Sequence, residues 1–246
     1  NRRFDCTIQM GGSDQWGNIT SGLDLIRRIE NKQAYALTYP LLTKSDGSKF
    51  GKSAGGAVWL NATKTSPYAF FQFWRNADDQ DVLNFLKVFT FLDLSEIEIL
   101  QQGMVQDPGM RLPQIRLAEE VTRLVHGEEG LLAAQRISEA LFSNAIQSLG
   151  ESDLAQVALD GLPVTNISVP ETSLTDVLVT SGLAVTPKGE VTVGQARKLI
   201  KSNAVSVNGE KVSDEATLLT MESALFGKYV IVQKGKKNHH LVVFEG

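Results

Sequence analysis

Cysteine and histidine are scarce: the 246-residue sequence holds one cysteine, Cys6, and three histidines. A lone cysteine excludes an internal disulfide and indicates a reducing compartment, and we expect Cys6 to be a small core residue. There is no Cys-x-x-Cys pair and no other metal-ligand pattern, so no metal site is predicted. Apolar runs stay well short of the ~20 residues needed to cross a bilayer, and no signal peptide is recognisable. These absences predict a cytoplasmic protein with no membrane partner.

The net charge is small at −4, and 42% apolar and 21% charged residues are ordinary for a folded protein. The length predicts two or three domains. Residues 187–246 contain nine Lys and Arg against six Asp and Glu, a net charge of +3, so residues 1–186 carry −7. A basic end on an acidic body favours contact with a polyanion, although a solvated surface explains so modest an excess equally well.

The first part of the chain has the order of an α/β unit. Residues 4–10 predict a strand, residues 11–18 a glycine-rich turn, and residues 19–31 a helix with apolar residues at helical spacing. Such a unit binds its ligand at the carboxyl end of the strand. A second strand is expected over 34–43, and residues 44–56 are so rich in Gly, Ser and Lys that they predict a mobile surface loop.

Helical patterns dominate the middle of the chain, where we expect an all-helical domain over 63–147. Ser66 is a plausible N-cap with Pro67 at the first helical position. An aromatic stripe is expected to form the core of this domain: Phe70, Phe71, Phe73, Trp74, Phe85, Phe89 and Phe91.

The last third changes character again. Residues 148–171 lose periodicity and contain two prolines, which predicts a linker. Residues 172–246 predict a small α+β domain with two short helices, a hairpin turning at Asn208 and Gly209, and a second hairpin around Gly235.

Two segments carry residues suited to chemistry. In residues 11–18, glycines let the backbone approach a ligand, while Asp14 can accept hydrogen bonds from a ribose or an ammonium group and Gln15 can donate to an oxyanion. A glycine-rich turn before a capped helix is an equal alternative. In residues 44–56, Lys49 and Lys52 can place ammonium groups against phosphates. This loop lacks the glycine spacing of a P-loop, and taken alone its lysines are better explained as solvated.

Taken together, "GGSDQWGNI" and the later "KFGKS" resemble the bacterial-type tyrosyl-tRNA synthetases, class I enzymes whose second signature loop is KMSKS. The order that follows is also similar: "RLVHGEEG" in a helical domain, then a linker, then an S4-like RNA-binding domain in "GQARKLIKSNAVSVNGEKV". The resemblance covers essentially the whole chain. It implies the second half of a Rossmann-like α/β catalytic domain over 1–62, a helical anticodon-binding domain over 63–147, and an S4-like domain over 172–246.

The resemblance also implies a tyrosine–tRNA ligase, which makes tyrosyl-AMP from tyrosine and ATP, with Mg²⁺ accompanying the ATP, and transfers tyrosine to tRNA(Tyr). Asp14 would hold the ribose and Gln15 the reacting carboxyl or α-phosphate, with Gln9 at the wall of the tyrosine pocket and Gly12 permitting close approach of the nucleotide. The loop would bind the pyrophosphate side of ATP through Lys49, Lys52 and Ser53. The expected RNA-binding cations are Arg197, Lys198, Lys201, Lys211, Lys234, Lys236 and Lys237.

The sequence departs from the family in one respect, which bears on the expected activity of this chain. The family's first half, with its HIGH-type motif, its recognition of the tyrosine hydroxyl and most of its dimer interface, would lie upstream of Asn1. We therefore expect this chain alone to be catalytically incomplete, although its parent ligase is expected to act as a homodimer.

Two other functions stay open. A non-catalytic RNA-binding scaffold derived from a synthetase is one, although retention of Asp14, Gln15, Lys49 and Lys52 favours the ligase. A ligase for a related aromatic amino acid is weaker, because the tryptophan relatives lack an S4-like tail.

Overall fold

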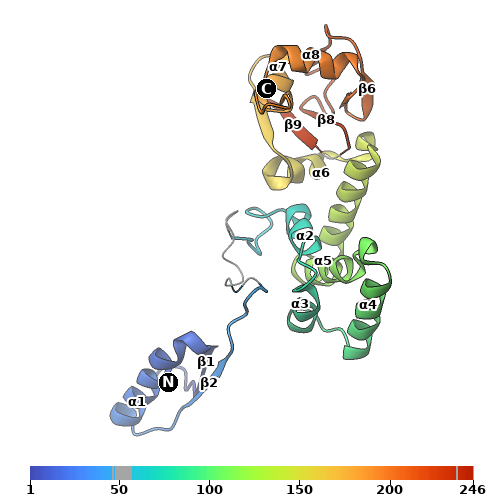
Figure 1. Ribbon diagram of the computed structural model, residues 1–246. Helices are drawn as coiled ribbons and strands as arrows, with labels where there is room; N and C mark the ends of the chain where they lie inside the picture. Colours follow the sequence, from blue (N-terminus) through green and yellow to red (C-terminus); the bar gives the residue numbers. More distant parts are fainter. Residues whose placement is uncertain (46, 48–56, 237, 246) are drawn as a thin grey trace. The chain divides into compact units, whose positions relative to one another are not determined.

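The structure is a computed structural model that describes residues 1–45, 47, 57–236 and 238–245 (Figure 1). It divides into two compact units, Asn1–Ala57 and Val58–Gly246, each described here by itself. The loop predicted over 44–56 lies largely outside the described residues, and so does the site predicted at Lys49, Lys52 and Ser53.

The first unit is a strand, helix, strand arrangement. Its elements are β1 (Ile8–Gly12), a 3₁₀ turn (Ser13–Gln15), α1 (Trp16–Glu30) and β2 (Tyr35–Tyr39). The strands are parallel, with Ile8 beside Tyr35 and Gly12 beside Tyr39, as expected when a helix forms the crossover. The strand begins four residues later than predicted and the helix three residues earlier. Cys6 is exposed, so the expectation that it is a core residue is wrong.

Helix α1 covers one face of this strand pair. A Cβ atom on Gly11 would lie 3.2 Å from Ile19 Cδ1, so the helix approaches the strand closely there. Among the described residues of this unit, Ile19 is the one buried large apolar side chain. The other face carries large side chains that are each more than half exposed: Ile8, Met10, Tyr35, Leu37 and Tyr39. Parallel sheets are normally covered on both faces. In contrast, the described residues of this unit leave one face of its strand pair uncovered.

The second unit begins with helices, as predicted: α2 (Pro67–Arg75), α3 (Val82–Phe89), α4 (Leu94–Gln106) and α5 (Leu112–Ser143). The predicted cap is confirmed, because Ser66 Oγ accepts a hydrogen bond from the N–H of Ala69 at 3.0 Å. Trp74 is 6% exposed and centres the aromatic core, with edge contacts to four of the predicted aromatic rings. Phe91, which lies beyond the end of α3, is 92% exposed, so its predicted burial is wrong.

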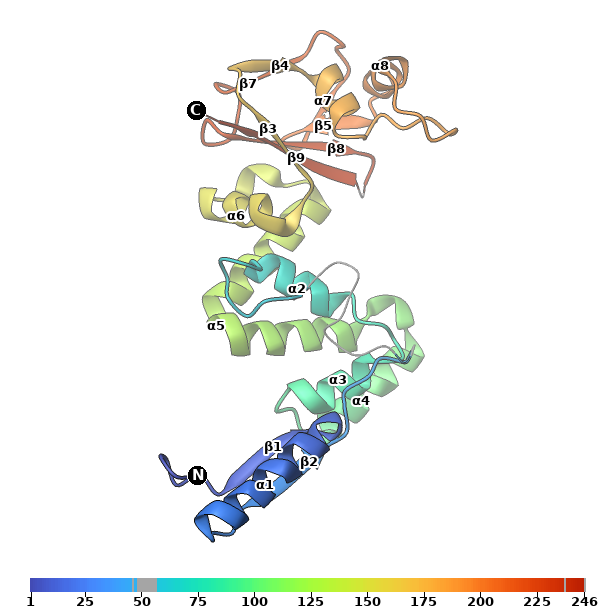
Figure 2. The same cartoon turned by 90° about the vertical axis from the view of Figure 1, so that its left-hand side faces the viewer.

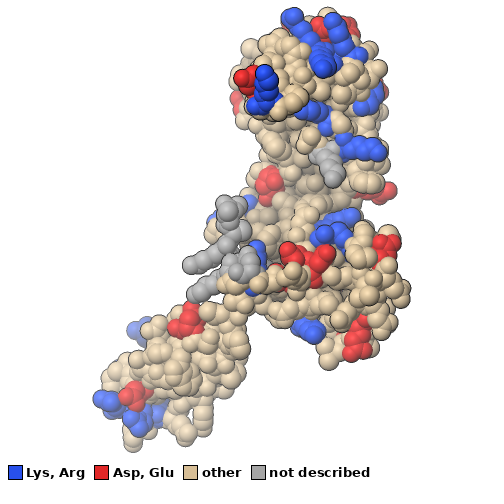
Figure 3. Space-filling model, viewed as in Figure 1, with Lys and Arg blue, Asp and Glu red and all other residues tan. Residues whose placement is uncertain are grey.

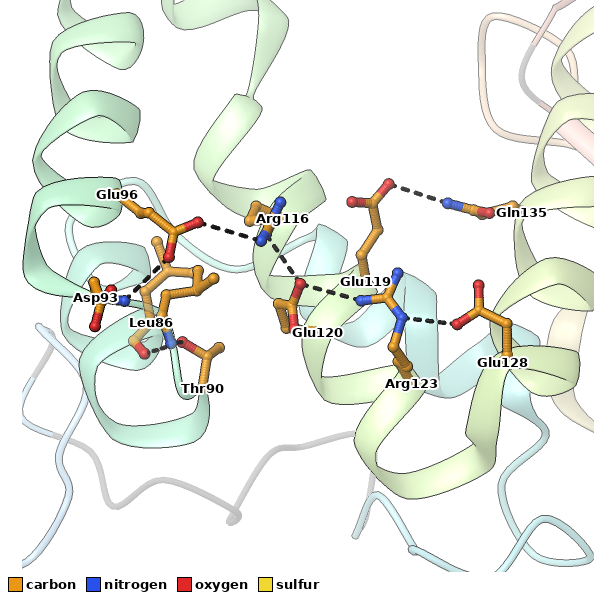
Figure 4. Close-up of polar contacts among 11 residues, drawn as sticks. Leu86, Thr90, Asp93, Glu96, Arg116, Glu119, Glu120, Arg123, Glu128 and Gln135 are labelled. Atoms are coloured by element: carbon orange, nitrogen blue, oxygen red, sulfur yellow. Dashed lines mark hydrogen bonds and ion pairs between the residues drawn. The ribbon is translucent and has the colours of Figure 1, made fainter.

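Helix α5 is sharply kinked at Gly127, whose φ of 72° and ψ of 179° suit only glycine. We call residues 112–126 its first arm and residues 128–143 its second arm. Side chains join the two arms across the kink. Gln135 donates to Glu119 at 3.0 Å and Arg123 donates to Glu128 at 2.8 Å (Figure 4). The arms therefore lie side by side at these positions, as two helical stretches separated by Gly127.

Residues 148–171, predicted as a linker, are folded. They hold α6 (Glu151–Gln156), a π-helical turn (Val157–Gly161) and β3 (Val164–Ile167), and β4 (Glu171–Ser173) begins at their end. Asp160 accepts from the N–H of Ser66 at 3.0 Å, and Gln156 accepts from the N–H of Tyr68 at 3.3 Å. This segment thus satisfies backbone donors at the start of α2.

The carboxyl-terminal part is the predicted α+β fold. Its main sheet has the order β3-β9-β8-β5-β6, with β5 (Val205–Val207), β6 (Glu210–Val212), β8 (Tyr229–Lys234) and β9 (Asn238–Phe244). Strand β4 pairs with β7 (Leu218–Thr220), and the two helices are α7 (Leu174–Thr180) and α8 (Val193–Lys201). Asn208 and Gly209 both have positive φ, which confirms the predicted primed turn.

The main sheet is buried on both faces. Figure 2 shows it between α7 and α8 on one side and α6 with the end of α5 on the other. Along β8, Val230 and Val232 join the core under α7 and α8, whereas Ile231 joins a second core with Ile137 of α5 and Leu154 of α6. The helices and the sheet of this unit therefore share an apolar core.

Candidate functional site

The glycine-rich turn ends β1 and places Asp14 at its carboxyl end. Asp14 is exposed and lies in the 3₁₀ turn directly after Gly12 and Ser13. A Cβ atom on Gly12 would lie 2.8 Å from Asp14 Oδ1 and 2.8 Å from Leu41 Cδ2. A side chain at position 12 would therefore displace the ends of the Asp14 and Leu41 side chains.

The two glutamines predicted beside Asp14 are placed differently. Gln15 follows Asp14 in the same turn, and its Oε1 accepts from Asn18 Nδ2 at 3.0 Å, so its amide NH₂ is the group left to donate. Gln9 lies against α1, because its Oε1 would be 3.5 Å from a Cβ atom on Gly22. Gly12 and the carboxylate of Asp14 lie on the opposite face of the strand pair. The structure thus brings Asp14 and Gln15 together and directs Gln9 toward the helix.

The predicted RNA-binding cations gather on the carboxyl-terminal part, where Figure 3 shows Lys and Arg side chains. Thr192 caps α8 by accepting from the N–H of Gln195 at 3.1 Å. Ala196 and Ile200 of α8 are buried, while Val193 at its start is 45% exposed.

The exposed face of α8 carries the predicted cations Arg197, Lys198 and Lys201. Glu215 lies near two of them, with Lys201 Nζ 2.5 Å and Arg197 Nε 3.8 Å from its carboxylate oxygens. Arg197 and Lys201 therefore share one carboxylate, and with Lys198 beside them this face is positive.

The lysines of the strands differ from one another. Lys211 of β6 and Lys236 after β8 are exposed. Lys234 instead donates to the carbonyl of Leu183 at 2.6 Å and is partly buried, so it ties β8 to the chain after α7. Lys237 lies outside the described residues. Lys234 is therefore a structural cation in addition to any contact it makes with RNA.

Comparison with known proteins identifies the family. Residues 3–143 match the family described as tRNA synthetases class I (W and Y). The chain belongs to this family of class I tRNA synthetases. Residues 153–242 of the synthetase chain also match the domain described as Tyrosine–tRNA ligase SYY-like C-terminal domain, which begins within the segment predicted as a linker.

Curated relatives align with this synthetase chain along its whole length. It is 51% identical over 245 residues to the Tyrosine–tRNA ligase of Aliivibrio fischeri and 49% identical to that of Salmonella arizonae, covering 100% of this chain and 56% of each relative. The chain thus spans about half the length of the curated relatives it matches. Among solved structures, a C-terminally truncated mitochondrial tyrosyl-tRNA synthetase of Aspergillus nidulans is 32% identical, with a TM-score of 0.46, over 56% of this chain and 39% of that one.

Burial lowers the pKa of two of the three histidines, His240 and His126. His240 is 5% exposed and shares a hydrogen bond with Thr165 at 2.8 Å, and burial lowers its pKa. His126 packs edge-on against Phe70, and burial lowers its pKa also. Across the described ranges, no cluster of His, Cys, Asp and Glu is suited to a metal ion, and no helix is long and apolar enough to span a membrane.

Proposed function

We propose that the chain is the carboxyl-terminal part of a tyrosine–tRNA ligase acting in the cytoplasm. The observation that carries this proposal is the 51% identity to a tyrosine–tRNA ligase over the whole chain. The match of residues 153–242 to a tyrosine-ligase domain favours tyrosine over tryptophan within the family. The full-length ligase would act as a homodimer, as the resemblance implies.

In this function the first unit supplies one wall of the tyrosyl-adenylate site. The carboxylate of tyrosine attacks the α-phosphorus of ATP, and pyrophosphate leaves with its Mg²⁺. Asp14 would accept hydrogen bonds from the ribose hydroxyls, and the NH₂ group of Gln15 would donate to the reacting end. Lys49 and Lys52 would neutralise the leaving pyrophosphate. These residues position and neutralise the reactants, which is the main contribution that a protein makes to phosphoryl chemistry of this kind.

Tyrosine-dependent exchange of pyrophosphate into ATP tests this assignment. The 246-residue chain alone is expected to show no exchange, because the resemblance assigns recognition of the tyrosine hydroxyl and the HIGH-type motif to the part of the relatives that it does not span. Joined to that part of the Aliivibrio fischeri ligase, it is expected to show exchange, which Asp14→Ala should reduce about a hundredfold. Exchange by the chain alone would contradict the first expectation. A joined protein that binds RNA without exchange would favour the scaffold.

The carboxyl-terminal part would hold tRNA(Tyr) through its phosphates, as the S4-like resemblance implies. Arg197, Lys198, Lys201, Lys211 and Lys236 are the exposed cations that support this, together with the local positive charge. Contacts of this kind position an RNA by its backbone and shape.

Replacing Arg197 and Lys201 together by alanine is expected to weaken tRNA binding and to flatten its salt dependence by up to about two units of slope. Arg27 and Arg28 of α1 provide a matched control, because their side chains are similarly exposed. They pair with one carboxylate, Asp24, just as Arg197 and Lys201 pair with Glu215. The Arg27→Ala, Arg28→Ala variant should bind as the unchanged chain does. Fluorescence anisotropy of labelled tRNA across a salt titration measures both, and equal slopes in the two variants would refute the assignment.

A further inference from the structure

The amide group of Gln15 is held by a second amide, that of Asn18. Asn18 Nδ2 donates to Gln15 Oε1 at 3.0 Å. Gln15 ends the 3₁₀ turn, and Asn18 lies three residues later in the first turn of α1, so the two side chains lie on one side of the start of the helix. The sequence predicted no role for Asn18, and this contact connects it to the candidate site.

Packing fixes the stem of Gln15 and the backbone next to Asn18. A Cβ atom on Gly11 would lie 3.5 Å from Gln15 Cβ and 3.8 Å from Gln15 Cγ, so the stem of Gln15 rests on the end of β1. Ile19, the residue after Asn18, is 1% exposed and packs against the same glycine. The strand therefore positions the stem of Gln15 and the start of α1. The terminal amide of Gln15 is the group that Asn18 orients.

The direction of this hydrogen bond determines what Gln15 presents on its other side. A glutamine amide has a carbonyl oxygen that accepts and an NH₂ group that donates. Because Asn18 donates to the oxygen, the NH₂ group of Gln15 points away from Asn18. The terminal torsion of a glutamine is broad and roughly two-fold, so without a partner the oxygen and the NH₂ group exchange places readily. The orientation of Gln15 therefore depends on its partner.

The helix itself does not account for an asparagine at position 18. Asparagine is a weaker helix former than alanine, and an aspartate in the first turn would interact favourably with the helix dipole. Alanine or aspartate at this position would thus stabilise α1 more than asparagine does. A role in helix stability and a role in orienting Gln15 therefore predict opposite consequences for these two substitutions.

We propose that Asn18 is a positioning residue for the activation of tyrosine, and that it holds the amide of Gln15 with its NH₂ group toward the α-phosphate of ATP. In this step a carboxylate oxygen of tyrosine bonds to the α-phosphorus, and the bond from that phosphorus to the pyrophosphate oxygen breaks. A fixed NH₂ donor stabilises the charge on the α-phosphate oxygens in the transition state, whereas a reversed amide would place its own oxygen against them. The inference rests on the proposed function, in which Gln15 is that donor.

The joined ligase, in which this chain is combined with the part of the Aliivibrio fischeri protein that it does not span, is the protein to test by tyrosine-dependent exchange. Asn18→Ala frees the amide of Gln15 and is expected to lower kcat about tenfold, with KM for tyrosine and ATP within about twofold, because the donor acts mainly in the transition state. Asn18→Asp only accepts at neutral pH, so it should reverse the amide and lower kcat about a hundredfold. Both variants should unfold at an unchanged or higher temperature.

Two controls separate orientation from other effects. Asn18→Asp in a Gln15→Ala background should lower kcat by less than about threefold, because no amide is left to reverse. Ser21→Ala, one turn further along α1, removes a hydroxyl that donates to the carbonyl of Gly17 at 2.8 Å. This variant should keep kcat within about twofold of the unsubstituted ligase.

Unchanged kcat in both Asn18 variants of an active joined ligase would overturn the inference and leave the proposed function standing. Equal losses from Asn18→Asp with and without Gln15 would also overturn it, since the added charge would then act directly on the substrates. Unchanged kcat in Gln15→Ala would show that Gln15 is not the donor, and the inference would fall with that role. Absence of exchange by the unsubstituted joined ligase would overturn both the inference and the proposed function.

Discussion

Replacing Arg136 by methionine is expected to lower the free energy of unfolding by about 3 kcal/mol at neutral pH. Arg136 of α5 donates to both carboxylate oxygens of Asp153 in α6, at 2.9 and 2.6 Å. The Asp153 side chain is only 2% exposed, so removal of the guanidinium leaves a buried charge with one remaining donor, the N–H of Gly150 at 3.0 Å. The Arg136 side chain is 47% exposed, so the expected loss of stability lies at the lower end of the range for buried pairs.

Arg123→Met is the matched control for this change. Arg123 lies on the same helix and is similarly exposed at 42%, but its partners Glu120 and Glu128 are 25% and 59% exposed. Ion pairs in solvent contribute little, so this variant should lose less than about 1 kcal/mol. Urea unfolding at pH 7 compares the two variants. Equal losses would mean that burial of Asp153 does not determine the cost.

The pH dependence gives a second readout of the same pair. Burial alone raises the pKa of the Asp153 carboxyl, but the hydrogen bonds from Arg136 and Gly150 and the guanidinium charge outweigh it, so this pKa lies below its ordinary value. A depressed folded-state pKa gives stability above the unfolded pKa that is lost as pH falls through the folded one. Without Arg136, the burial of the Asp153 carboxyl remains and its pKa rises. The contribution of this carboxyl to the pH dependence of stability then reverses its sign. The deficit of Arg136→Met should therefore shrink as pH falls from 7 toward about 3.

Local signals in the sequence predicted much of the fold. Ser66 caps α2 as expected, and the Asn208-Gly209 turn closes its hairpin. Each of these depends on residues within a few positions of one another. Residues 148–171 were predicted incorrectly because their structure depends on distant partners: β3 pairs with β9, and Asp160 bonds to the backbone of Ser66, 94 residues away.

The sequence predicted which residues belong to the candidate site better than it predicted where their side chains lie. Motif spacing singled out Asp14 and Gln15, which the structure places in one turn. Side-chain alternation along a five-residue strand was not assigned in advance, so Gln9 was not expected against α1. The contact between the two arms of α5 escaped prediction for a different reason. It forms because Gly127 bends α5 and brings Glu119 next to Gln135, and no local pattern specifies the angle of that bend.

Replacing Ile231 by alanine is expected to lower the free energy of unfolding by about 3 kcal/mol and to destabilise the helices of the second unit together with the sheet. Ile231 is 1% exposed and packs on the sheet face that shares a core with Ile137 and Leu154. Trp74 lies outside this core among the aromatic rings of the helices, so its fluorescence reports on the helices separately.

The measurement uses a chain in which Trp16 and Trp59 are replaced by phenylalanine, so that Trp74 is the one remaining tryptophan. If the shared core couples the two parts, Trp74 fluorescence and far-ultraviolet circular dichroism shift to lower urea concentration together in the Ile231→Ala variant. Leu218→Ala, a half-exposed position in β7, should leave both transitions in place. A Trp74 transition that stays unchanged while the sheet unfolds earlier would show that the helices fold independently. Coupling would instead fix the helices of the second unit and the cations of α8 in one body, so that a bound RNA meets both at a set spacing.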